Sequence, residues 1–104
     1  MQIEKLETFD RNLKKLRIQE KIKKNILSDF EQMDATQASQ IPYFKVGFYK
    51  AFKKYQKGQY RILFAYCKEC YRKYRHILKC KFCSETNLER LVLYDIHNRS
   101  EGYD

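Results

Sequence analysis

Four cysteines constrain the fold of this chain more than any other feature. They form two pairs of equal spacing, Cys67-x2-Cys70 and Cys80-x2-Cys83, with nine residues between the pairs. Each short loop places two thiolates near one point, so together they suit a single tetrahedral zinc ion. Two disulfides or four buried thiols are the alternatives. Four thiolates fill the coordination sphere of zinc, so the predicted ion is structural, and His76 is surplus to the ligand set.

Composition and charge favour a polyanionic partner. The chain has 104 residues, enough for one small domain with a modest core. Its formal net charge is +9, and aromatic residues make up 15% of it. Cations that meet phosphates and rings that stack on bases are typical of RNA-binding proteins, whereas a lysine-rich surface that only serves solubility is the alternative.

The sequence carries no export or membrane signal that we recognise. The N-terminus, MQIEKLETFDRNLKKL, is charged from residue 4 and has no hydrophobic signal-peptide core. No stretch is long and apolar enough to cross a bilayer. We therefore expect a cytoplasmic protein with no membrane partner. Structural disulfides are rare in the cytoplasm, which favours zinc for the cysteines.

The first part of the chain is predicted to be mainly helical. Residues 1–5 are predicted as a short strand, and Thr8 as the N-cap of a helix. Whether the helical region is one helix or a hairpin that bends near Lys15–Arg17 stays open, because no Gly or Pro marks a break. Asp34–Pro42 is predicted as a polar connection. The predicted core positions recur at helical spacing, namely Phe9, Leu13, Leu16, Ile18, Ile22, Ile26, Leu27, Phe30 and Met33.

The second part of the chain is predicted to be mainly extended. Aromatic and β-branched residues predict strands at Tyr43–Gln56, Gln59–Cys67 and Leu88–His97, with Lys57-Gly58 as a tight turn. The element order predicts an α+β fold, in which a small antiparallel sheet packs on the N-terminal helix or helical hairpin. Residues 67–87 are predicted to be an inserted zinc-binding β-hairpin within one domain that spans residues 1–104.

Two segments of the sequence resemble the RelE/ParE toxin superfamily. FYKAFKKYQKGQYRILFAY (Phe48–Tyr66) is similar to a strand-turn-strand that reads (K)-x-x-R-x-G-x-YRI-x-Y in many members. LVLYDIHNRSEGYD (Leu91–Asp104) is similar to the last strand of the family, which typically ends HR-x-x-x-Y, and Arg99 and Tyr103 keep that spacing. The N-terminal FDRNLKKL also looks similar. The resemblance covers about residues 1–66 and 88–104, and the cysteine segment stands where the family usually has a short turn.

The resemblance implies a toxin with a cognate antitoxin as partner. RelE-type members are endoribonucleases that cleave mRNA, typically at the ribosome, through attack of a ribose 2′-OH on the adjacent phosphorus. They are known for using Arg, Lys and Tyr side chains. Arg61 matches the strand arginine of the family and is expected to stabilise the phosphate. Arg99 adds a second guanidinium, and Tyr103 is expected to transfer a proton or to stack on a base.

The residues themselves suggest two more members of the catalytic set. If Lys57-Gly58 is a two-residue turn, Lys54 lies directly opposite Arg61, and a three-residue turn instead places Lys53 and Tyr55 beside Arg61. His97 is either a general base or a packing residue. The cations predicted to bind RNA lie on the preceding strand and in the cysteine segment, namely Lys50, Lys53, Arg72, Lys73, Arg75 and Lys79.

The sequence departs from the family pattern at two positions. Gln56 stands where an arginine often precedes the turn glycine, and Asn98 stands in place of the histidine of the HR pair. ParE-like members share the fold, act on DNA gyrase and lack the catalytic set, so a non-nuclease toxin is the first alternative. A zinc-knuckle protein that regulates through nucleic-acid binding is the second.

Overall fold

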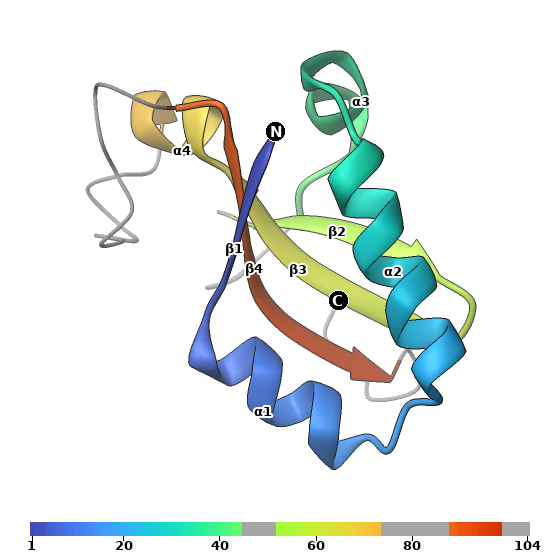
Figure 1. Ribbon diagram of the computed structural model, residues 1–104. Coiled ribbons are helices and arrows are strands. Elements are labelled where there is room, and N and C mark those ends of the chain that lie inside the picture. Colours follow the sequence, from blue (N-terminus) through green and yellow to red (C-terminus); the bar gives the residue numbers. More distant parts are fainter. Residues whose placement is uncertain (45–51, 74–87, 99–104) are drawn as a thin grey trace.

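The computed structural model describes residues 1–44, 52–73 and 88–98, and the fold of these residues is α+β. Figure 1 shows one twisted sheet with helices packed against it. The strands are β1 (Gln2–Lys5), β2 (Lys53–Lys57), β3 (Tyr60–Tyr66) and β4 (Arg90–Asn98). The helices are α1 (Glu7–Lys15), α2 (Glu20–Gln32), α3 (Ala35–Gln40) and α4 (Cys67–Lys73).

The sheet is mixed, so the prediction of a wholly antiparallel sheet is wrong at one edge. The strand order is β1-β4-β3-β2, with β1 parallel to β4 and the other neighbours antiparallel. Parallel neighbours need a long connection between them. Here that connection consists of the helices together with β2 and β3, which lie between β1 and β4 in the chain.

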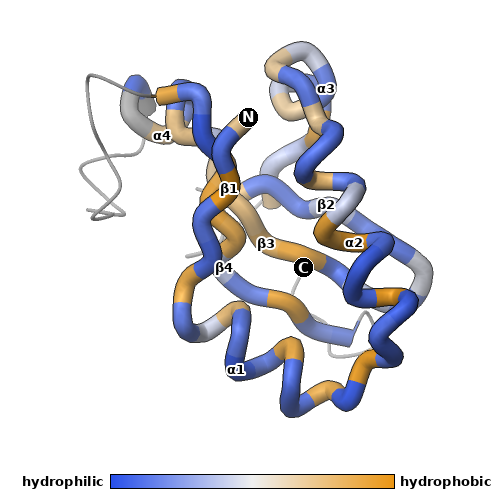
Figure 2. The backbone as a smooth tube through the Cα atoms, in the orientation of Figure 1, coloured by the Kyte–Doolittle hydropathy of each residue, from blue (hydrophilic) through white to orange (hydrophobic). Residues whose placement is uncertain are grey.

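The core lies between the helices and one face of the sheet. Phe30 of α2 is fully buried and meets Tyr55 and Phe64 edge-on, with ring centroids 5.2 and 5.1 Å apart. Phe9 of α1 belongs to the same buried cluster. Figure 2 shows the pattern behind this packing of helices on the sheet. The helices alternate between hydrophilic and hydrophobic residues, whereas much of β3 is hydrophobic. The predicted helical stripe is therefore confirmed as core.

The helical region is a hairpin of two helices, which answers the question that the sequence left open. The chain turns between Lys15 and Glu20, and Arg17 takes a left-handed φ of 53° although it is not glycine. Thr8 is not the N-cap. The cap position is Leu6, which makes no side-chain capping bond, and its backbone N–H donates to Leu93 of β4. The sheet, rather than a capping side chain, sets the start of α1.

The predicted polar connection contains a short helix, α3. Asp34 and Gln37 form a reciprocal capping box, in which each side chain bonds the backbone N–H of the other residue. This pairing is a recognised signature of a helix start. Ala38 then buries itself in the core.

The segment before the β2–β3 turn is not one extended strand. Tyr43 is an antiparallel bridge partner of Lys53, so Tyr43–Gln56 does not run in one direction as predicted. The turn itself is Gly58–Gln59 rather than Lys57-Gly58, because Lys57 pairs with Tyr60. Gly58 has a φ of +59°, a left-handed conformation that favours glycine and is typical of two-residue hairpin turns.

A β-bulge interrupts the pairing of β3 with β4. Leu63 pairs with Asp95 whereas Phe64 pairs with Leu93, which leaves Tyr94 as the extra residue. Asp95 Oδ1 accepts hydrogen bonds from the Ile96 backbone N–H at 2.8 Å and from Asn12 Nδ2 at 2.6 Å. The bulge therefore provides a second point, besides the Leu6–Leu93 bond, at which α1 is hydrogen-bonded to the sheet.

The first cysteine pair lies in a helix. Residues Cys67–Lys73 form α4, so the predicted β-hairpin is wrong for this part, and residues 74–87 lie outside the described residues. In the three described ranges no helix has both the length and the apolar character needed to span a membrane.

Replacement of Phe30 tests the helix-to-sheet core. We expect Phe30→Ala to lower the free energy of unfolding by about 3–5 kcal/mol, because it leaves a cavity among the surrounding rings. Urea unfolding monitored by circular dichroism measures the change. Glu31→Ala, at the next and exposed position of α2, is the matched control and should change stability by less than about 0.5 kcal/mol.

Candidate nucleic-acid interface

One row of side chains crosses three strands on the face of the sheet away from α1 and α2. Arg61 of β3 pairs with Gln56 of β2 on one side and with His97 of β4 on the other. Directly paired residues project to the same side of a sheet, so these three side chains share a face. Tyr55 and its partner Ile62 alternate with them and lie on the helix side, where Tyr55 meets Phe30.

Lys54 lies on the same face as Arg61 but not opposite it. Its direct partner is Leu63, so both predicted arrangements, direct opposition and the three-residue turn, are wrong. The reason is the one-residue displacement of the turn to Gly58–Gln59. Lys54 remains a diagonal neighbour of Arg61, which typically separates Cα atoms by about 7–8 Å and keeps the like charges from direct opposition.

The members of this face differ in burial. Arg61 and Lys54 are partly exposed, and the Lys54 ammonium lies 5.5 Å from the centre of the Phe44 ring. His97 is 3% exposed, so its side chain is buried rather than presented on the surface of this face. Of the two roles predicted for His97, its burial fits the packing role, while Arg61 and Lys54 keep contact with solvent.

Aromatic residues next to this row form a second, smaller core. Phe44, Phe52 and Leu63 are buried there together with Ala65 and Cys70. Phe52 stacks on Tyr94, with ring centroids 4.3 Å apart. Because Phe44 and Phe52 are buried, their rings are not exposed platforms on which bases could stack.

The burial of Lys53 does not fit its predicted role in RNA binding. The residue is 0% exposed, and its side chain lies on the opposite side of β2 from Lys54. The ammonium donates to the backbone carbonyls of Ala38, Ser39 and Ile41 at 2.7, 3.2 and 3.0 Å. These carbonyls belong to the end of α3, where the helix leaves its acceptors unsatisfied and where a cation is favourable.

A carboxylate from α4 completes the environment of Lys53. Glu69 Oε1 lies 3.1 Å from the Lys53 ammonium and also accepts a hydrogen bond from the Tyr43 hydroxyl. Burial raises the pKa of Glu69, but hydrogen bonds from Tyr43, Lys53 and Ser39 oppose it, and the net pKa is lowered. Glu69 is therefore held in its charged form opposite the buried ammonium.

The first cysteine pair is buried at the start of α4. Cys67 and Cys70 are 4% and 5% exposed, and their three-residue spacing puts both on one side of the helix. Cys80 and Cys83 lie outside the described residues. Within residues 1–44, 52–73 and 88–98, no group of three or more His, Cys, Asp or Glu side chains is arranged to hold a metal ion.

The remaining predicted site residues are only partly placed. Arg72 is exposed on α4 and lines a hollow of about 460 Å³ between α3 and α4, together with Ser39 and Lys68. Lys73 belongs to the last turn of α4. Five predicted residues lie outside the described ranges, namely Lys50, Arg75, Lys79, Arg99 and Tyr103.

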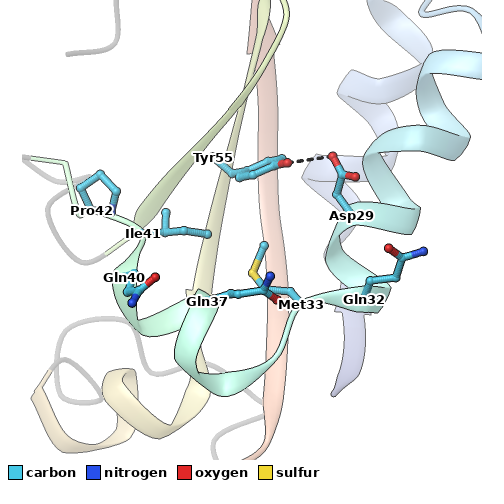
Figure 3. A pocket seen from close by; sticks show the side chains of 8 residues that line it. All are labelled: Asp29, Gln32, Met33, Gln37, Gln40, Ile41, Pro42 and Tyr55. Atoms are coloured by element: carbon cyan, nitrogen blue, oxygen red, sulfur yellow. Dashed lines mark hydrogen bonds between the residues drawn. The ribbon is translucent and has the colours of Figure 1, made fainter.

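A polar cleft of about 420 Å³ lies on the helix side, between α2, α3 and β2 (Figure 3). Several of its polar groups bond within the protein. Tyr55 donates to Asp29 at 2.7 Å, Lys57 pairs with the same carboxylate at 2.8 Å, and the Gln37 side chain belongs to the capping box of α3. This cleft is separate from the face that carries Arg61.

Neither the Lys53–Glu69 ion pair nor the part-buried hydrogen bond between Tyr55 and Asp29 was predicted from the sequence. The sequence held one signal that bears on Lys53. Neighbouring lysines on a strand project to opposite faces, so Lys53 and Lys54 were not both available to one surface. The partners of Lys53 come from α3 and α4, and no spacing in the sequence indicates them.

Comparisons with protein-family models, with curated proteins and with solved structures give no match to this chain.

The Asp29–Tyr55 hydrogen bond predicts a pH-dependent contribution to stability. Burial and this bond raise the pKa of Tyr55 to about 12. The fold therefore favours the neutral phenol, and its contribution is complete below the ordinary pKa of 10.0 and lost as the pH rises through about 12. We expect Tyr55→Phe to lower the free energy of unfolding at neutral pH by about 0.5–1.5 kcal/mol.

Urea unfolding of both chains across this alkaline range provides the test. The difference in stability between the wild type and Tyr55→Phe should shrink as the pH approaches 12. A difference that stays constant with pH would show that ionisation of Tyr55 is not coupled to folding.

Proposed function

We propose that this protein is the toxin of a toxin–antitoxin pair and acts as a RelE-like endoribonuclease on mRNA at the ribosome. The observation that carries the proposal is the shared face of Lys54 and Arg61, two partly exposed cations on adjacent strands. The resemblance of the strand-turn-strand and of the C-terminal segment to the RelE/ParE superfamily supports the same reading. Its partners are RNA, the ribosome and an antitoxin protein.

The chemistry requires positive charge where the phosphorane forms. The ribose 2′ oxygen forms a bond to phosphorus, the bond to the 5′ oxygen breaks, and a proton moves from the first oxygen to the second. Arg61 suits the equatorial phosphate oxygens because its guanidinium donates in a planar fork, and Lys54 adds a point charge beside it. Tyr103 and Arg99 are proposed from the resemblance as the proton-transfer residue and the second guanidinium.

A non-nuclease toxin of the ParE type is the second candidate. The observation in its favour is Gln56, which pairs directly with Arg61 at a position where many family members carry an arginine. A neutral side chain there leaves one cation fewer beside the phosphate. In this case the target is a protein such as DNA gyrase.

Replacement of Arg61 tests the nuclease. We expect Arg61→Ala to reduce cleavage of ribosome-bound mRNA by about 100-fold or more, because a preorganised cation for the transition state is lost. Gel analysis of cleaved mRNA measures the rate, and growth arrest on expression is scored in parallel. Arg11→Ala, at an exposed position of α1, is the matched control and should cleave normally.

The same experiment separates the two candidates. A wild-type chain that arrests growth while mRNA stays intact contradicts the nuclease and favours the ParE-type toxin. Loss of arrest and loss of cleavage together in Arg61→Ala, with an unchanged circular dichroism spectrum, support the nuclease.

We also propose that Cys67, Cys70, Cys80 and Cys83 bind one structural zinc ion. The proposal is supported by the paired spacing and by the common orientation of Cys67 and Cys70 on α4. Bound zinc would add a stabilising core to a segment that carries several cations, including Arg72, Lys73, Arg75 and Lys79. That segment is proposed to guide RNA towards the Arg61 face.

Metal analysis of the purified full chain tests the zinc site. We expect one zinc ion per chain and four thiols that react with a thiol reagent only after a chelator is added. Cys80→Ser and Cys67→Ser should each lower zinc retention on dialysis, whereas the surplus His76→Ala should not. Four thiols that react without chelator would contradict the site.

A further inference from the structure

Lys53 is the most deeply buried charged side chain in the described ranges, and it connects three elements. It belongs to β2, its ammonium bonds three carbonyls at the end of α3, and its counterion Glu69 comes from α4. The Tyr43 ring lies 4.8 Å from the same ammonium. A buried charge is tolerated only when it is paired and hydrogen-bonded, so these partners depend on one another.

Glu69 lies between the two cysteines of the first pair. The sequence of the first turn of α4 is Cys67-Lys68-Glu69-Cys70, so whatever holds Glu69 also sets the orientation of both thiols. Tyr43 donates to the same carboxylate and reinforces its position. A helix of seven residues is not stable by itself and takes its orientation from such contacts.

We propose that Lys53 and Glu69 are positioning residues for the cysteine pair: their ion pair orients the first turn of α4 so that Cys67 and Cys70 face a bound metal ion together. The inference rests on the proposed zinc site and does not depend on the nuclease. Residues that orient metal ligands from outside the coordination sphere typically change metal affinity by about 10–100-fold when replaced. Neither residue donates to the metal.

The coupling is reciprocal. If the ion pair favours metal binding, metal binding must stabilise the ion pair by the same factor. The stabilised contacts include the end of α3 and strand β2, where the backbone N–H of Lys54 donates to the Pro42 carbonyl at 3.0 Å. Zinc at α4 therefore strengthens the strand that carries Lys54, without any contact between the two.

Zinc affinity of the full chain is the first test. Competition with a chromophoric chelator should show zinc binding about 10–100-fold weaker in Glu69→Gln than in the wild type. Lys68→Met is the matched control, because Lys68 also lies between the cysteines but pairs only loosely with Glu89, at 3.9 Å, and is 45% exposed. Its zinc affinity should stay within about threefold of the wild type, since exposed ion pairs contribute little.

A second variant distinguishes weaker zinc binding from loss of the folded structure. Glu69→Gln leaves the buried ammonium without its carboxylate, whereas the double replacement Lys53→Met and Glu69→Leu removes both charges and is expected to preserve the fold. The double variant should unfold cooperatively and still bind zinc at least tenfold more weakly. Wild-type zinc affinity in this folded variant would overturn the inference.

Amide hydrogen exchange supplies a readout that a purely structural role would not change. Addition of zinc should slow exchange at Ile41 and Lys54 in the wild type and have little effect on them in Glu69→Gln. Equal slowing in both chains would refute the inference and leave the zinc site intact. A wild-type chain that binds no zinc would refute both, and neither result depends on whether RNA is cleaved.

Discussion

Strand β3 is the constraint on which the rest of the structure depends. It is the inner strand that pairs antiparallel with both β2 and β4, and most of its residues are buried. On one side Ile62 and Phe64 meet the helices, and on the other Leu63 and Ala65 belong to the second core. Arg61 is its one partly exposed residue in the described ranges, at the end next to the turn. Because β3 pairs with a strand on each side, the backbone at Arg61 is held in place, while its side chain keeps access to solvent.

The alternation of side chains along β2 gives two neighbouring lysines opposite roles. Lys54 lies on the face of Arg61, and Lys53 is buried on the other face, where it bonds the end of α3 and Glu69. The positive charge of the chain therefore cannot all be assigned to a polyanion. Lys53 is one of the cations counted in the net charge, but it is buried inside the structure.

The features that were predicted correctly depend on short-range patterns. The strand at residues 1–5, the helical core stripe, the hairpin around Gly58 and the α+β class follow from periodicity and turn chemistry. The errors arose where a tertiary contact decides the outcome. Leu6 replaces Thr8 as the cap because its N–H bonds Leu93, and the turn moved by one residue because Lys57 pairs with Tyr60.

The predictions for the candidate site divide in the same way between short-range patterns and tertiary contacts. Combined with a two-residue turn, period-two alternation places Lys54 and Arg61 on one face, but their register depended on which two residues form the turn. The burial of Lys53 was not predictable, because it depends on partners from α3 and α4, and for His97 the sequence left the packing role as one of two alternatives. The capping box of Asp34 and Gln37, in contrast, was readable in the sequence, and α3 was missed only because its segment was short and polar.

The register also explains how Gln56 affects the charge beside Arg61. Gln56 pairs directly with Arg61, so an arginine in its place would set two guanidinium groups side by side on adjacent strands. Like charges in direct opposition destabilise a sheet. Glutamine avoids this repulsion and can still donate a hydrogen bond to a phosphate oxygen, while Lys54 supplies the second charge from the diagonal position. A glutamine at this position therefore carries less charge than an arginine would, but it leaves a hydrogen-bond donor beside Arg61 on the proposed site.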